Sequence, residues 1–181
     1  MRRIPVVAAP LLLPLLAGVA FLMSSTPASA KGSTVRIEVR GATLATPLDI
    51  TAPAIVSKFS IWTGPGVGVN GQPTHLDPDH QEGMFIDWPK GTVTARPPGL
   101  ESYEVTFHIG DPRPPRTEYQ SYVVLYEPER GTQQGYIYLP GYPDEIGQAN
   151  MSAIAHGVER NWFHSSKAWE ELVRPIILAS R

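Results

Sequence analysis

Residues 103–110 read Tyr-Glu-Val-Thr-Phe-His-Ile-Gly, and this stretch decides the fold. Its large apolar side chains occupy every second position, which is the period of a strand with one buried face. A second strand is expected at 122–127, where both faces are apolar, so it is expected in the centre of a sheet. After the turn-like residues 128–134, a further alternating run at 135–139 predicts an antiparallel hairpin with 122–127.

Shorter elements are expected upstream of these strands. Residues 34–40 alternate strictly, with Val35, Ile37 and Val39 predicted to share one face. Two short strands are expected at 84–88 and 92–95. A short helix is expected at 53–59, with Thr51 as its cap.

The C-terminal residues change to a helical period. The apolar residues fall at i, i+3, i+4, i+7 and i+8, the stripe of an amphipathic helix: Trp169, Leu172, Val173, Ile176 and Ile177. Ser165 or Ser166 is expected to cap this helix, and Pro175 to bend or shorten it. Trp169, Leu172 and Ile176 are predicted to be buried. Lys167, Glu170 and Glu171 are predicted to face solvent. Residues 151–163 fit either a helix or a strand, and a strand or turn is favoured there.

These elements together predict the α+β class. The expected architecture is an antiparallel β-sheet of five or more strands packed by a C-terminal amphipathic helix. A β-sandwich with peripheral helices is the alternative.

The first thirty residues are predicted to be a secretory signal peptide. A basic start, an apolar run and a small-residue tail ending in Ala28-Ser29-Ala30 follow one another in the order that such signals require. An uncleaved membrane anchor is the alternative, because the apolar run approaches the length needed to span a bilayer. Prolines interrupt that run, and no cationic flank follows it. We therefore expect residues 31–181 to form a single soluble α+β domain that is exported to the periplasm or the extracellular space.

Charge and cysteine usage narrow the classes of partner. The signal segment holds two of the 15 basic residues and none of the 17 acidic ones, so 13 basic and 17 acidic residues give the remainder a net charge of −4. A mildly acidic domain lacks the basic footprint of nucleic-acid binding and the polybasic stretch that attracts membrane surfaces. The chain has no cysteine. An exported domain without disulfides suits a bacterial envelope better than a eukaryotic secretory route.

One segment contains residue types that bind metals. His75, Asp77, Asp79 and His80 place two imidazoles and two carboxylates within six residues, a set that suits zinc or another divalent metal. A metal-dependent hydrolase using this loop is one functional hypothesis. The alternative is an ordinary solvated turn, because no standard ligand spacing accompanies the cluster. On that alternative the chain needs no cofactor.

Aromatic residues gather in the last third of the chain. Tyr122, Tyr126, Tyr136 and Tyr138 could line a face that binds carbohydrate or an envelope protein, or they could fill the core. No nucleophile elbow is present, and the glycine-rich run at 66–71 is not followed by a helical pattern. The leading hypothesis is therefore an exported, non-catalytic binding or structural module of the bacterial envelope or extracellular space.

Overall fold

A computed structural model describes residues 32–62, 85–142, 144, 146, 150 and 158–181. The seven strands in these residues form one antiparallel sheet in the order β2-β1-β4-β5-β6-β7-β3. Their bounds are β1 Ser33–Gly41, β2 Leu48–Ile50, β3 Thr92–Val93, β4 Tyr103–Gly110, β5 Glu118–Pro128, β6 Gly135–Leu139 and β7 Asn161–His164. The predicted antiparallel sheet is confirmed. The sandwich alternative is not what the described strands form.

The strands that carry the strongest alternation lie at the centre of this sheet. β5 is the fourth of the seven strands, as its two apolar faces predict. β5 and β6 form the predicted hairpin, with Leu125 opposite Tyr138 and Glu127 opposite Tyr136. At the ambiguous C-terminal segment, residues 161–164 are strand β7, and residues 151–157 lie outside the described part of the chain.

Alternation places one set of strand residues in the core and the other on the opposite face of the sheet. Ile37, Val39, Val105, Phe107 and Val124 belong to the core cluster. On the opposite face, the type of side chain changes from one side of the sheet to the other. It is ionic on β1, β2 and β4, and aromatic on β6 and β7, where Tyr138 lies opposite Trp162.

Three upstream expectations need correction. The helix α1 spans only Pro53–Val56, and its N-cap is Ala52, without a side-chain cap from Thr51. The strand expected at 84–88 is reduced to a single bridge between Ile86 and Ser165, because the 3-10 turn η1 (Trp88–Lys90) follows at once. Pro89 lies within this turn, where its ring cannot donate to a strand ladder. The short strand β2 was not predicted.

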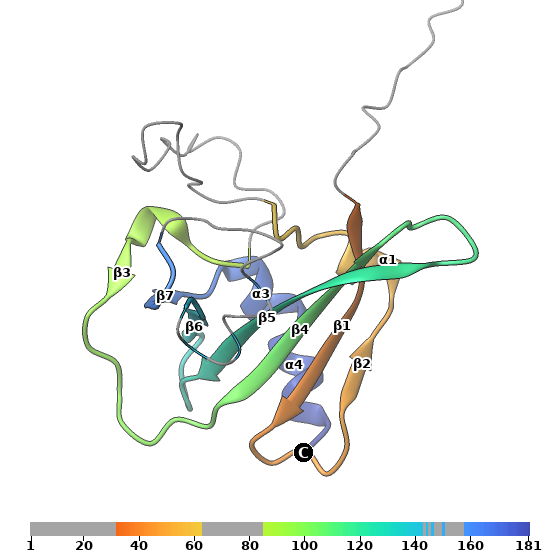
Figure 1. Cartoon of the computed structure of the whole chain (residues 1–181). Coiled ribbons are helices and arrows are strands. Elements are labelled where there is room, and N and C mark those ends of the chain that lie inside the picture. Colours follow the sequence, from red (N-terminus) through yellow and green to blue (C-terminus); the bar gives the residue numbers. More distant parts are fainter. Residues whose placement is uncertain (1–31, 63–84, 143, 145, 147–149, 151–157) are drawn as a thin grey trace, which may run out of the picture.

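The C-terminal helical stripe is divided into two helices, α3 (Lys167–Leu172) and α4 (Arg174–Ala179). Ser166 is the N-cap of α3 and accepts a hydrogen bond from the Trp169 backbone N–H at 3.1 Å. Pro175 lies in the first turn of α4, so the predicted shortening at this proline is confirmed. Figure 1 shows both helices behind the sheet. Trp169, Val173 and Ile177 are fully buried and belong to the same core cluster as the inward residues of the sheet.

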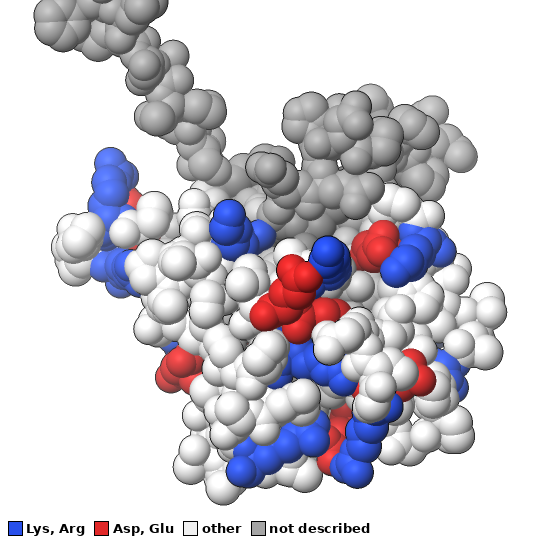
Figure 2. Space-filling view, turned by 180° about the vertical axis from the view of Figure 1, so that it is seen from behind, with Lys and Arg blue, Asp and Glu red and all other residues white. Residues whose placement is uncertain are grey.

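The helical side of the molecule does not present a surface of one charge. Acidic and basic side chains are interspersed over the described residues seen in Figure 2. Within the described ranges, no helix is long and apolar enough to cross a membrane.

Candidate functional site

The four tyrosines proposed for ligand binding are divided between the two faces of the sheet. Tyr122 and Tyr126 are fully buried in the core. Tyr136 is buried and Tyr138 half-buried on the opposite face. Burial raises the pKa of each of these phenols. The structure therefore does not bring the four residues to one surface, and three of them are buried.

Tyr138, the one of these four tyrosines that is not buried, is engaged by its own neighbours. The Tyr138 ring packs against Trp162 with 5.2 Å between ring centroids, and its hydroxyl donates to Asp144 at 2.8 Å. The Arg96 guanidinium lies 3.7 Å from the centre of the Trp162 ring and is also paired with Glu127. Because Arg96 covers this indole, Trp162 serves packing rather than offering a free platform for a sugar ring.

The predicted metal ligands His75, Asp77, Asp79 and His80 lie outside the described residues. Within the part of the chain that the structure describes, no group of three metal-ligating side chains is gathered. The His108 ring nitrogens lie beside the carboxylates of Glu38 and Glu118 on the sheet.

A buried carboxylate behind the sheet is fully engaged by structural contacts. Glu170 was expected in solvent, but it is buried, and its carboxylate accepts from the Tyr126 hydroxyl at 3.0 Å and from Arg174 at 2.7 Å. The Ser165 hydroxyl also donates to it. Arg174 continues to the carbonyl of Gln134 in the β5–β6 turn, 3.1 Å away. This network joins α3 and α4 to the hairpin. A neighbouring cavity of about 320 Å³ contains Ser165 and Glu170 in its wall, but both side chains are already hydrogen-bonded to each other.

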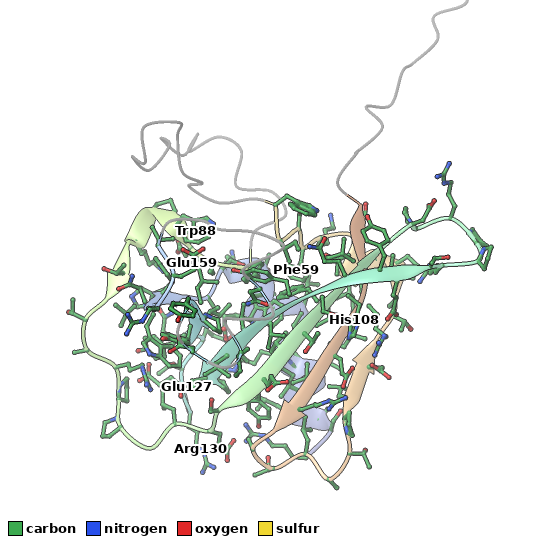
Figure 3. All side chains as sticks on the ribbon, in the orientation of Figure 1. Phe59, Trp88, His108, Glu127, Arg130 and Glu159 are labelled. Carbon is green, nitrogen blue, oxygen red and sulfur yellow. The ribbon has the colours of Figure 1, made fainter. Side chains whose placement is uncertain are left out.

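An ionic cluster ties the other half of the sheet together. Arg36 donates to both carboxylate oxygens of Glu118 at 2.9 Å, to Glu38 at 2.9 Å and to Asp49 at 2.8 Å. The His108 ring lies between two of these acids, 3.3 Å from Glu38 and 3.2 Å from Glu118. The hydrogen bonds from Arg36 hold the pKa of Glu118 below its ordinary value. Figure 3 places His108 in a different part of the sheet from Glu127. The cluster fixes the first residue of β5, and with it the end of the β4–β5 loop (residues 111–117).

Two irregularities in strand pairing occur at this same end of the sheet. Thr34 pairs with Ile109 and Arg36 pairs with His108, which leaves Val35 as an extra residue in β1. Between β4 and β5 the register shifts at Gly110, which leaves Tyr119 as an extra residue. Such bulges re-aim side chains and are over-represented beside functional sites.

The consequences of the two bulges differ. Val35 is buried but does not belong to the core cluster that contains Ile37 and Val39. Tyr119 is 59% exposed, and its hydroxyl occupies the place where a Cβ on Gly32 would lie. Gly32 has a φ of +71°, so this position favours glycine for its backbone conformation, and any larger residue would also have to displace the exposed Tyr119 ring.

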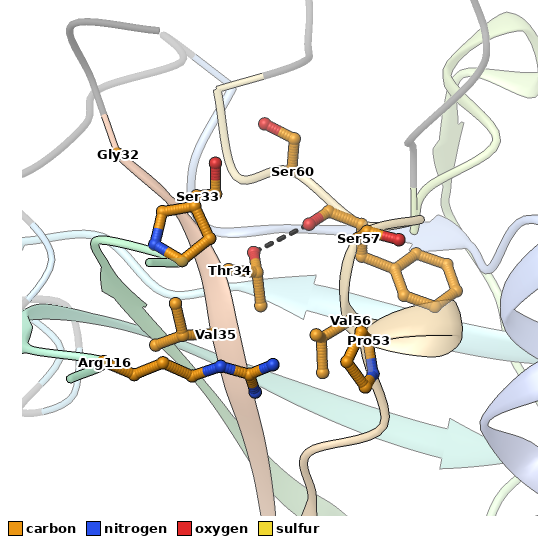
Figure 4. A pocket seen from close by; sticks show the side chains of 11 residues that line it. Gly32, Ser33, Thr34, Val35, Pro53, Val56, Ser57, Ser60 and Arg116 are labelled. Carbon is orange, nitrogen blue, oxygen red and sulfur yellow. Dashed lines mark hydrogen bonds between the residues drawn. The ribbon is translucent and has the colours of Figure 1, made fainter. Parts of the chain in front are cut away.

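A cleft of about 330 Å³ opens beside the bulge in β1 (Figure 4). Its walls come from three segments: the start of β1, α1 with the residues after it, and the β4–β5 loop. They comprise Gly32, Ser33, Thr34, Val35, Pro53, Val56, Ser57, Phe59, Ser60, Pro112 and Arg116. Val35, Val56 and Phe59 are each less than 5% exposed and form an apolar floor. The size and the mainly apolar lining are those of a small-molecule site.

Hydrogen bonds hold the three walls in place. The Thr34 hydroxyl donates to the Phe59 carbonyl at 2.7 Å, which joins β1 to the segment after α1. Arg116 Nη1 donates to the Thr51 carbonyl at 3.3 Å, which joins the loop to the segment before α1. Within the loop, Arg113 binds Asp111 through its backbone and its guanidinium, and this contact lowers the pKa of Asp111 to about 2. The cleft is therefore bounded by segments that the fold fixes.

The sequence contained only indirect signals of this cleft. Its residues are spread over three segments, and none belongs to a recognised motif. Comparison with protein-family models, with curated proteins and with solved structures finds no match to the chain.

Proposed function

We propose that the chain is an exported, non-catalytic binding module that takes a small ligand in the cleft between β1, α1 and the β4–β5 loop. One observation supports this most directly. The β1 bulge at Val35 takes one apolar side chain out of the core cluster, and that residue lines a cleft whose floor is apolar. A cleft of this size with an apolar floor and a few polar groups at its walls is the usual form of a small-molecule site.

The chemistry of the lining suits binding rather than catalysis. Hydroxyl groups and one guanidinium surround the apolar floor. No carboxylate or imidazole is among the described lining residues, so none of them supplies the general base that hydroxyl nucleophiles need. In this proposal α3 and α4 act as packing elements behind the sheet rather than as a docking surface.

The lining also bears on whether the ligand is a carbohydrate. A carbohydrate site usually offers an exposed aromatic platform. Among the described lining residues the one aromatic ring is that of Phe59, which is 1% exposed and packs edge-on against Trp169 at 5.2 Å. A ligand with an apolar portion fits this cleft better than a sugar does.

The test uses an uncharged apolar probe, so that it depends only on the floor. The full chain is expressed, the exported protein is isotope-labelled, and octan-1-ol is titrated into it while amide chemical shifts are recorded. We expect one saturable site, with the largest shifts at Val35, Val56 and Ser57.

Two substitutions locate the site. Ser57→Trp places an indole at the exposed edge of the cleft and should abolish the saturable shifts. Thr94→Trp makes a similar change at an exposed position beside β3, the opposite edge strand of the sheet, and should leave them unchanged. Octanol binding that persists in Ser57→Trp, or its absence from the unsubstituted protein, would refute the proposed function.

A further inference from the structure

We propose that the ligand of this cleft is a small amphipathic anion, with its apolar chain on the floor and its charged group on Arg116. This inference rests on the proposed function and adds the chemical class of the ligand. It follows from the charge of Arg116 in the cleft wall and from the chemistry of the buried lining residues Thr34, Val35 and Val56.

Arg116 differs from the arginines near it in having no acidic partner among the residues that the structure describes. Arg36 is paired with three carboxylates, and Arg113 is paired with Asp111. Arg116 is exposed, and its side chain makes one hydrogen bond to the described residues, to the Thr51 carbonyl at 3.3 Å. A carbonyl does not neutralise a guanidinium. Among the described residues no carboxylate pairs with Arg116, so the cleft wall carries a positive charge whose other N–H donors make no hydrogen bond to those residues.

The direction of this side chain brings the charge to the cleft. Figure 4 shows Arg116 extended across β1, with its guanidinium turned toward Pro53 and Val56. The charge thus lies beside the apolar floor. A planar guanidinium is suited to carboxylates and related anions, because two parallel N–H groups can bind two oxygens.

The inner wall disfavours a ligand that is polar throughout. The Thr34 hydroxyl is buried, and its proton is committed to the Phe59 carbonyl at 2.7 Å. The neighbouring inner side chains, Val35 and Val56, have no polar atoms. A polar group placed there would lose its water without gaining a donor, whereas an alkyl chain would gain from burial. Charge at the wall and apolar surface beneath it match a molecule with one anionic end.

The experiment compares two probes that differ in their head group, octanoate and octan-1-ol. We expect octanoate to bind the exported protein about tenfold more tightly than octanol, a preference in the low part of the range for charge-assisted hydrogen bonds because Arg116 is exposed. Shortening octanoate to hexanoate should weaken binding by about fifteenfold, because each buried methylene contributes roughly a fourfold factor.

The substitutions assign the preference to one side chain. Arg116→Gln should remove the preference, so that this variant binds octanoate and octan-1-ol with equal affinity. Arg116→Lys should retain part of the preference, because the charge remains without the planar fork. Lys58→Gln removes an exposed cation next to Ser57 that does not line the cleft, and it should leave both affinities unchanged. Unchanged melting temperatures show that these variants remain folded.

Each result has a separate meaning. Equal affinities for octanoate and octanol in the unsubstituted protein, or an octanoate preference that survives Arg116→Gln, would overturn the anionic ligand and leave the binding cleft standing. Failure of both probes to bind would remove the proposed function itself. Arg116-dependent binding to phosphatidylglycerol vesicles without binding of free octanoate would replace the small ligand with a membrane surface and so overturn the inference.

Discussion

Substitution of Trp169 by alanine tests the largest single contribution to the core. Trp169 is fully buried, and its ring contacts four other aromatic rings. The centroid distances are 5.2 Å to Phe59, 6.4 Å to Phe85, 5.9 Å to Phe107 and 5.6 Å to Tyr126. Phe107 belongs to β4, Tyr126 belongs to β5 and Phe59 lines the cleft. Trp169 therefore connects α3 to the centre of the sheet and to the cleft.

The expected loss follows from these contacts. Truncating a buried tryptophan to alanine commonly costs about 3 to 5 kcal/mol, which combines lost burial with the cavity left behind. The indole N–H is buried and has no hydrogen-bond partner among the described residues, which offsets part of that contribution. We expect a loss of about 4 kcal/mol in the free energy of unfolding, a large share of the ~5 to 15 kcal/mol typical of a domain. The melting temperature should fall by roughly 8 to 16 °C.

Urea unfolding followed by tryptophan fluorescence and circular dichroism measures this change. Trp169→Phe should cost less than half as much, because it keeps a ring among the four others and removes the unpaired N–H. Glu171→Ala is the matched surface control on the same helix. Its side chain is 59% exposed, and its contact with Lys167 is a 3.6 Å surface pair, so its effect should stay within about 0.5 kcal/mol. A Trp169→Ala protein with an unchanged midpoint would show that α3 does not stabilise the sheet, and would make the helical stripe a docking face instead.

Three further predictions concern pH, metal and processing. The pKa of Glu118 is lowered in the folded state, so the ionised carboxylate stabilises the fold above the ordinary carboxyl pKa of about 4.5. This stabilisation is lost as the pH falls through the folded pKa. Glu118→Gln should therefore lose less free energy of unfolding than the unsubstituted protein between pH 6 and pH 3 in urea titrations. The purified exported protein should contain no stoichiometric zinc by elemental analysis; zinc that disappears in a His75→Ala, His80→Ala double variant would favour the metal-dependent hydrolase. N-terminal sequencing of protein recovered after bacterial expression should begin at Lys31, and an intact Met1 in the membrane fraction would contradict the signal peptide.

The sheet was predictable because its strands carry their own pattern. The alternation at 103–110 and the apolar run at 122–127 specify strand type, buried face and central position without reference to the rest of the chain. Ser166 and Pro175 similarly act through the backbone of their own helix, and their effects appear where the sequence predicts them. β2 has only three residues, so its period could not be read.

Glu170 illustrates a different limit. Its position predicts exposure, because it falls outside the apolar stripe of the amphipathic helix that begins at Trp169. Its burial depends on Arg174 one turn later and on Tyr126 and Ser165 from the sheet. A buried carboxylate is tolerated only when such partners converge on it, and convergence of distant segments leaves no periodic trace in the sequence.

The cleft lies where local pattern and actual pairing disagree. The alternation at 34–40 predicts Val35 on the face of Ile37 and Val39, but the bulge removes it from their cluster and places it in the cleft wall. At the second bulge, β5 extends four residues before the predicted strand, and Tyr119 remains exposed beside Gly32. Regular pairing would have kept Val35 on the same face as Ile37 and Val39. Sequences that specify one fold tend to break local rules at functional sites. Two bulges, an apolar floor and an Arg116 without an acidic partner among the described residues coincide at one end of the sheet, which favours the proposal of binding there over the aromatic face of β6 and β7.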